Sequence, residues 1–169
     1  KSEYANAVGL AIGQQLYGLG FNLNFAPNVD VNNNPRNPVI NVRSFGDNPE
    51  VVGQLGQAMS QGMQSANILT TAKHFPGHGD THVHSHSGLP QVKHTKAQAM
   101  AEDILPFASI INSAVPPAMV MSAHIQYPSL DDTEIADKKK ERCLPCDKCL
   151  KDWISTVWSS GLEKWRKLI

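Results

Sequence analysis

The chain has 169 residues, of which 41% are hydrophobic and 18% are charged, a composition typical of a globular protein with one core. Lysine plus arginine number 15 and aspartate plus glutamate also number 15, so we expect no basic surface that would bind a nucleic acid. No apolar run approaches the roughly 20 residues of a membrane-spanning helix, and a targeting segment would have to lie outside this chain.

Helical and strand patterns alternate three times along the chain. Apolar or small residues recur at helical spacing between Tyr4 and Tyr17, and the glycines at Gly18 and Gly20 end that pattern. The predicted elements are helices at residues 4–17, 49–66 and 96–112 and strands at residues 21–27, 68–75 and 117–125. This alternation predicts an α/β fold with parallel strands, either an open doubly wound sheet or part of a (β/α)8 barrel. The third strand is nearly all apolar, so we expect it to be almost fully buried.

Two long connections follow the first two predicted strands. They cover residues 28–48 and 76–90, whereas such connections usually have roughly two to six residues. Ligands of parallel α/β folds bind at the carboxyl ends of the strands. Arg43, Lys73 and His74 lie in or beside these connections and can offer several hydrogen-bond donors to oxygen-rich groups. We interpret them as candidate binding residues, with a plain salt-bridge role for Lys73 as the alternative.

Five of the seven histidines lie within residues 73–90, KHFPGHGDTHVHSHSGLP. His82, His84 and His86 occupy every second position, so in a strand they would share one face and could bind zinc. The proline and glycines of this stretch disfavour a regular strand, and only Asp80 offers a carboxylate to orient an imidazole. We therefore predict no metal site here and keep zinc as the alternative.

Two longer stretches carry a resemblance to a known family. They are NFAPNVDVNNNPRNPVINVRSFG at residues 24–46 and KHFPGHGDTHVHSHSGLP at residues 73–90. With ILPF and VMSAHI further along, they resemble the N-terminal barrel domain of family 3 glycoside hydrolases, in particular the bacterial β-N-acetylhexosaminidases. The resemblance implies a partial (β/α)8 barrel of about three β/α units over residues 1–132. It also implies a carbohydrate partner, since the family removes terminal β-linked N-acetylglucosamine with retention, through a covalent intermediate and without a cofactor.

The same resemblance implies roles for individual residues. Arg43, Lys73 and His74 stand where the family holds the sugar hydroxyls and the acetamido group. His86 matches the imidazole that acts as general acid and then as general base, and an ordinary pKa of about 6.5 suits both tasks. His84 stands where the family has the aspartate that completes a catalytic dyad, and a neutral His84 could accept one hydrogen bond. The family's nucleophile, in a TDAL-like stretch, has no counterpart in this chain, so we expect the chain alone to be inactive.

The resemblance ends near Asp132, and residues 133–169 differ in composition. They hold all three tryptophans and all three cysteines, the latter spaced C-x2-C-x2-C at Cys143, Cys146 and Cys149. We interpret this tail as an out-of-frame or disordered segment, with metal binding by the cysteines as the alternative. The cysteines do not decide between the bacterial cytoplasm and the periplasm.

Two other functions stay open at this point. One is a small metal-binding protein that uses the histidine-rich stretch or the cysteine cluster. The other is a non-catalytic sugar-binding remnant that keeps Arg43, Lys73 and His74. Stoichiometric zinc would identify the first, and sugar binding without glycosidase turnover would identify the second.

Overall fold

The computed structural model describes residues 1–81 and 90–131, and the order of its elements is the predicted one. The elements are α1 Ser2–Gly18, β1 Leu23–Asn24, the 3-10 helix η1 Asn41–Arg43, α2 Pro49–Ser65, β2 Leu69–Phe75, α3 Lys96–Gln98, the π-helix η2 Ala99–Asp103, α4 Leu105–Ile111 and β3 Met119–Ser122. Helical segments and strands alternate three times, so the predicted α/β organisation is confirmed.

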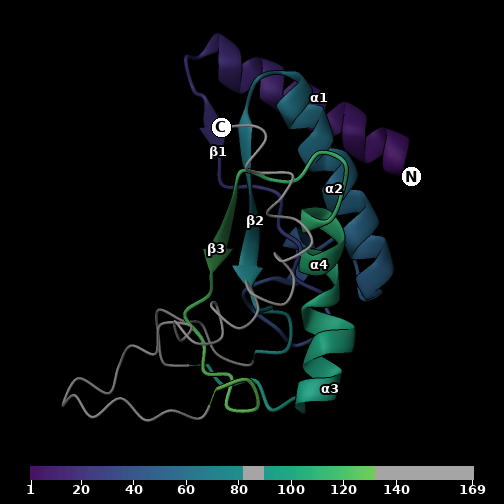
Figure 1. The fold of residues 1–169 in the computed structure, drawn as a ribbon, viewed down its shortest axis with the longest axis vertical. Coiled ribbons are helices and arrows are strands. Elements are labelled where there is room, and N and C mark those ends of the chain that lie inside the picture. The colour runs from purple at the N-terminus through teal and green to yellow at the C-terminus, as the bar shows by residue number, and fades with distance from the viewer. Residues whose placement is uncertain (82–89, 132–169) are drawn as a thin grey trace, which may run out of the picture.

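The three strands form one parallel sheet in the order β1-β2-β3. Leu23 lies opposite Leu69 in the first strand pair, and Thr71 lies opposite Met119 in the second. The helices lie on one side of the strands, and the carboxyl ends of the strands point toward the same end of the molecule (Figure 1). The connections that leave β1 and β2 therefore start at one end of the sheet, which is where parallel folds bind ligands.

Helix α2 has a defined start and a close contact with α1. Asn48 caps it, since its Oδ1 accepts a hydrogen bond from the Val51 N–H at 3.0 Å. Pro49 follows at the first helical position, where its missing N–H has no helical partner to lose. Further along, a Cβ at Gly62 would lie 2.1 Å from the Asn6 carbonyl oxygen of α1. Glycine is therefore required at this position for the two helices to approach each other.

The hydrophobic core lies against β2. Phe75 of β2 meets Phe107 of α4 edge to face, with the ring centroids 5.5 Å apart and the ring planes at 89°. Val29 and Val31, in the connection after β1, are also fully buried in this core and so anchor the backbone on either side of Asp30. The rest of the cluster is Val52, Ala72, Val92, Ala99, Ile104, Ile110, Ala123, Ile125 and Tyr127.

The helix predicted at residues 96–112 is interrupted. The Thr95 hydroxyl caps α3 by accepting a hydrogen bond from the Gln98 N–H at 3.3 Å, but the chain then passes through η2 and begins again as α4. Pro106 explains the break, because proline has no N–H to donate to the carbonyl group four residues earlier. The π-helical turn ends at Asp103, whose side chain is buried.

The outer strands are shorter than predicted, and β3 is less buried. Only Leu23–Asn24 of the predicted strand 21–27 is regular, although Asn28 makes a further isolated bridge to Lys73. The expectation of an almost fully buried third strand is wrong, since Met119 is 40% exposed and the rest of β3 is half-buried. Among the described residues β3 pairs only with β2, so within residues 1–81 and 90–131 its other edge has no paired strand.

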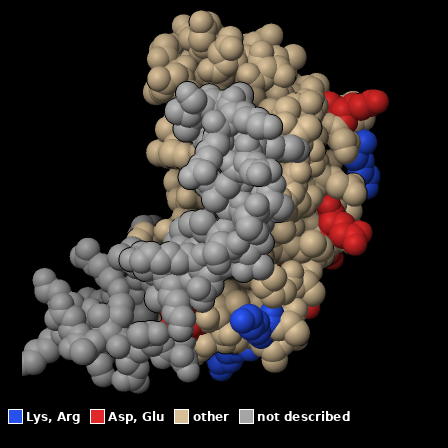
Figure 2. Space-filling view, in the orientation of Figure 1, with Lys and Arg blue, Asp and Glu red and all other residues tan. Residues whose placement is uncertain are grey.

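Among the described residues on the face shown in Figure 2, charged side chains are few. Acidic and basic groups lie along one margin and at the lower end, and neither sign forms a continuous patch there. In the part of the chain that the structure describes, no helix has the length and apolar character needed to cross a membrane.

Candidate functional site

The three binding residues predicted from the sequence share one region at the carboxyl end of β2. Lys73 and His74 are near the last residues of that strand, and Arg43 ends η1 in the connection after β1. Burial lowers the pKa of Lys73, the positive charge of Arg43 lowers it further, and the negative charge of Asp30 opposes both effects. The structure therefore places Arg43 and Asp30 close enough to Lys73 for their charges to act on it.

Asp30 lies at the centre of this region and is fully buried. Its Oδ2 is 2.7 Å from Nδ1 of His74, and its Oδ1 accepts a hydrogen bond from the His78 backbone N–H at 2.7 Å. The backbone N–H of His74 lies 3.2 Å from both carboxylate oxygens. A buried carboxylate is stable only when such donors replace water, and Asp30 has three of them. Sequence reasoning missed this residue.

Arg43 and Lys73 have side-chain hydrogen-bond donors, and only some of these donors bind acceptors among the described residues. Nη1 of Arg43 donates to the Val39 carbonyl oxygen at 3.1 Å, and the Arg43 side chain is otherwise exposed. Within residues 1–81 and 90–131, neither cation forms an ion pair with a carboxylate. Two neighbouring cations without a carboxylate partner are suited to a ligand with several oxygen atoms.

The turn at residues 77–81 follows the site and is fixed by Asn37. The side-chain amide of Asn37 donates to the carbonyl oxygens of His78 at 2.8 Å and Gly79 at 2.6 Å. A Cβ at Gly79 would lie 1.6 Å from the carbonyl oxygen of Val31, so only glycine fits there. His78 is 3% exposed, its Nδ1 lies 2.6 Å from the Thr81 hydroxyl, and burial lowers the pKa of its ring. His78 therefore supports this turn as a buried neutral imidazole.

A second polar cluster, which sequence reasoning also missed, surrounds His94. Its Nδ1 is 2.7 Å from Oδ2 of Asp103, and its Nε2 is 3.2 Å from Oδ2 of Asp80. The Tyr127 hydroxyl donates to the same Asp103 oxygen. Burial alone would lower the pKa of His94, but the hydrogen bond to Asp103 and the charges of Asp103, Asp80 and Glu102 together raise it. The cluster thus links the segments after β2 and β3 to the end of η2.

Replacing His94 by glutamine is expected to destabilise the chain more at low pH than at high pH. Because the pKa of His94 is raised in the folded chain, folding favours the protonated ring. This stabilisation is complete below about pH 6.5, the ordinary histidine pKa, while the carboxylates stay ionised, and it is lost as the pH rises through the raised pKa. Urea unfolding of both proteins across this range measures the difference, with the exposed His124→Gln as the control. A stability difference that grows with pH would contradict the assignment.

The predicted catalytic residues lie outside the described part of the chain. His84 and His86 fall within residues 82–89, as does His82 of the zinc alternative, and the cysteine cluster falls within residues 132–169. Within residues 1–81 and 90–131, no group of three or more histidine, cysteine, aspartate or glutamate side chains is arranged to hold a metal ion. The roles of His84 and His86 and both metal alternatives stay predictions.

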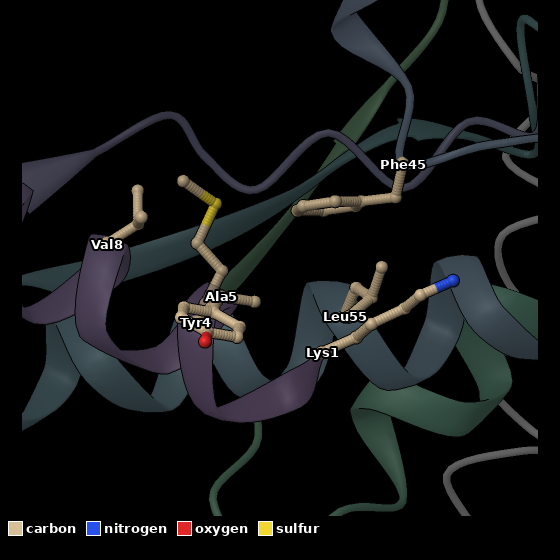
Figure 3. Close-up of a pocket in the computed structure, with 7 residues that line it drawn as sticks. Lys1, Tyr4, Ala5, Val8, Phe45 and Leu55 are labelled. Atoms are coloured by element: carbon tan, nitrogen blue, oxygen red, sulfur yellow. The ribbon is translucent and has the colours of Figure 1, made fainter.

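A shallow pocket between α1, α2 and Phe45 is not a candidate for catalysis. Figure 3 shows the Phe45 ring facing the two helices across it. Lys1 and Tyr4 are the only polar side chains among its lining residues, which also include Ala5, Val8, Phe45, Leu55 and Met59. Without converging polar groups, the pocket offers an apolar contact surface and no acid, base or nucleophile pair.

The parallel strands that alternate with helices, with the candidate site at their carboxyl ends, match barrel-type structures and belong to the (β/α)8-barrel class, of which these are about three units. Residues 1–156 match the glycosyl hydrolase family 3 N-terminal domain, and the chain belongs to this family. The resemblance seen in the sequence is therefore confirmed. The match runs past residue 132, where the sequence predicts the end of the barrel domain. That domain boundary stays a prediction.

Similar proteins include bacterial hexosaminidases. The chain is 55% identical to β-hexosaminidase A of Pseudoalteromonas piscicida over 138 residues. This match covers 82% of the chain and 23% of that protein. It resembles the structure of a family 3 β-N-acetylglucosaminidase from Paenibacillus, with a TM-score of 0.76, 41% identity, and coverage of 80% of this chain and 25% of that one. NagZ of Neisseria gonorrhoeae in complex with N-trifluoroacetyl-D-glucosamine gives a TM-score of 0.72, 34% identity, and coverage of 77% and 38%. The chain thus spans about a quarter to two-fifths of these relatives.

Proposed function

We propose that this chain supplies the sugar-binding part of an enzyme that hydrolyses terminal β-linked N-acetylglucosamine with retention of configuration. The observation that carries the proposal is the grouping of Arg43, Lys73 and His74 around the buried Asp30 at the carboxyl end of β2. Membership of glycosyl hydrolase family 3 and similarity to β-hexosaminidases support the reaction class.

Each side chain of the described site has a chemical task in this proposal. The guanidinium of Arg43 and the ammonium of Lys73 donate hydrogen bonds to sugar oxygens, and neither is held by a carboxylate among the described residues. His74 contacts the sugar with the edge of its ring that faces away from Asp30. Several donors acting on one sugar ring restrict its position, which is the first requirement of catalysis at a single glycosidic bond.

The acid-base chemistry is assigned to His86, with His84 as its partner. Protonated His86 gives its proton to the leaving oxygen as the glycosidic bond breaks, and a carboxylate nucleophile takes the sugar as a covalent intermediate. Neutral His86 then accepts a proton from the water that releases the sugar. One imidazole can perform both steps near neutral pH because its ordinary pKa is about 6.5.

A chimera tests the proposed function directly. The segment of Pseudoalteromonas piscicida β-hexosaminidase A that matches this chain is replaced by the matching residues of this chain, with which it is 55% identical. We expect the chimera to hydrolyse 4-nitrophenyl N-acetyl-β-glucosaminide and to lose activity when Lys73 is changed to methionine. The exposed Lys96, changed in the same way, is the control.

The alternatives predict different results for the same proteins. A folded chimera that binds N-acetylglucosamine but does not turn over the substrate would favour a sugar-binding remnant. Stoichiometric zinc in the purified 169-residue chain, with a loss of stability on chelation, would favour a metal-binding protein. A folded chimera that neither binds the sugar nor cleaves the substrate would refute the proposed function.

A further inference from the structure

We infer that Asp30 is a positioning residue, which holds His74 with its ring proton on Nδ1 and so leaves Nε2 as a hydrogen-bond acceptor. The consequence for recognition rests on the proposed function. A sugar hydroxyl that donates to Nε2 of His74 can at the same time accept from Lys73. The subsite would then select a hydroxyl group, which can do both, over an ether or carbonyl oxygen, which can only accept.

The geometry around the carboxylate fixes the direction of the His74 hydrogen bond. Two of the groups facing Asp30 are the backbone N–H groups of His74 and His78, which can only donate. An ionised carboxylate only accepts, so the third group, Nδ1 of His74 at 2.7 Å from Oδ2, has to carry a proton. No described residue makes a hydrogen bond to Nε2, the ring nitrogen on the opposite edge. The neutral ring therefore presents a lone pair there.

Asp30 and its neighbours also fix the backbone of the other two binding residues. The carbonyl oxygen of Asp30 accepts a hydrogen bond from the hydroxyl of Ser44 at 2.6 Å, and Ser44 directly follows Arg43. The backbone N–H of Val29, directly before Asp30, donates to the Lys73 carbonyl oxygen at 2.8 Å. The side chain of Asp30 orients His74, and its backbone segment connects the chain positions of Arg43 and Lys73. These contacts join residues far apart in the sequence.

The direct test is to determine the tautomer of His74 by NMR in the nitrogen-15-labelled chain of 169 residues. Long-range proton–nitrogen correlation spectra are recorded at about pH 9, where a histidine ring is ordinarily neutral. We expect a proton on Nδ1 and none on Nε2, with the signals assigned by their loss in His74→Gln. A ring protonated on Nε2, alone or together with Nδ1, would overturn the proposal. This measurement needs only the wild-type chain, so it decides the question even where a variant does not fold.

The Asp30→Asn variant tests whether the carboxylate of Asp30 is the cause of the single His74 tautomer. The amide can accept through its oxygen or donate through its nitrogen, so the His74 signals should show loss of the single tautomer. Asp103→Asn is the matched control, because His94 contacts Asp103 at the same 2.7 Å, and it should change the His94 signals alone. An unchanged His74 tautomer in folded Asp30→Asn would contradict the positioning role.

Titration with N-acetylglucosamine separates the positioning role from the proposed function. We expect the sugar to shift the Nε2 signal of His74 and to bind roughly 10-fold or more weakly to Asp30→Asn, the size expected for lost charge-assisted hydrogen bonds. If the tautomer is as expected but neither this chain nor the chimera binds the sugar or cleaves the substrate, the positioning role stands and the proposed function fails. If the sugar binds while Nε2 carries the proton, the proposed function stands and the positioning role fails.

Discussion

Replacing His86 by alanine in the chimera is expected to lower the rate of hydrolysis of a β-linked N-acetylglucosaminide by roughly 10²- to 10⁴-fold. This is the range that one general acid-base group contributes, and the variant would have to use water to protonate the leaving oxygen and to activate the attacking water. The measurement is kcat and KM with 4-nitrophenyl N-acetyl-β-glucosaminide. The loss should appear in kcat, because Arg43, Lys73 and His74 would still bind the sugar.

The leaving group and a second histidine sharpen this test. Nitrophenolate needs less help from an acid than an alcohol does, so the loss should be larger with a natural disaccharide, whose leaving oxygen is more basic. His82→Ala is the matched control in the same segment and should leave both constants within a few-fold of the wild-type values. A His86→Ala chimera with unchanged kcat on both substrates would refute the catalytic assignment of His86.

The order of the elements could be predicted from the sequence because it depends on local periodicity. The alternating pattern gave α1, α2 and β2 with nearly correct bounds. The interruption at η2 was not predicted, although Pro106 marks it, because the apolar spacing continues across the break. The exposure of β3 was missed for another reason, since burial depends on which elements surround a strand and not on the composition of the strand.

The candidate site was predictable only in part. Arg43, Lys73 and His74 stand out because they lie in or beside unusually long connections after strands, and because the family resemblance includes them. Asp30 gave no such signal, since its importance comes from contacts with residues 44 and 48 positions away. His94 and Asp103 likewise meet only in the folded chain, where they join the segment after β2 to the end of η2. A single sequence can indicate which residues are able to bind or react. It does not readily indicate which residues hold them in place, because those contacts form only on folding.

The family resemblance implies an aspartate where this chain has His84, and the described His94 shows how carboxylates act on an imidazole. His94 contacts a carboxylate at 2.7 Å, and the carboxylates around it raise its pKa. An aspartate at position 84 would act on His86 in the same way, by fixing one tautomer and stabilising the cationic ring. A neutral second imidazole could accept one hydrogen bond but would not stabilise the cationic ring, since protonating one ring disfavours protonating the other.

His84→Asp in the chimera is therefore expected to raise kcat, by roughly 10- to 1,000-fold. Replacing the triad carboxylate of a serine protease by a neutral amide costs about 10⁴ in rate, and we expect less here because water can partly fill the role. A carboxylate partner keeps His86 protonated to higher pH, so the alkaline limb of the kcat/KM profile should move to higher pH. His84→Asn is the matched control, because asparagine has the size of aspartate without its charge. This variant should not shift the alkaline limb. If His84→Asp changed neither kcat nor the profile while His86→Ala abolished activity, His86 would keep its role and the dyad would be refuted.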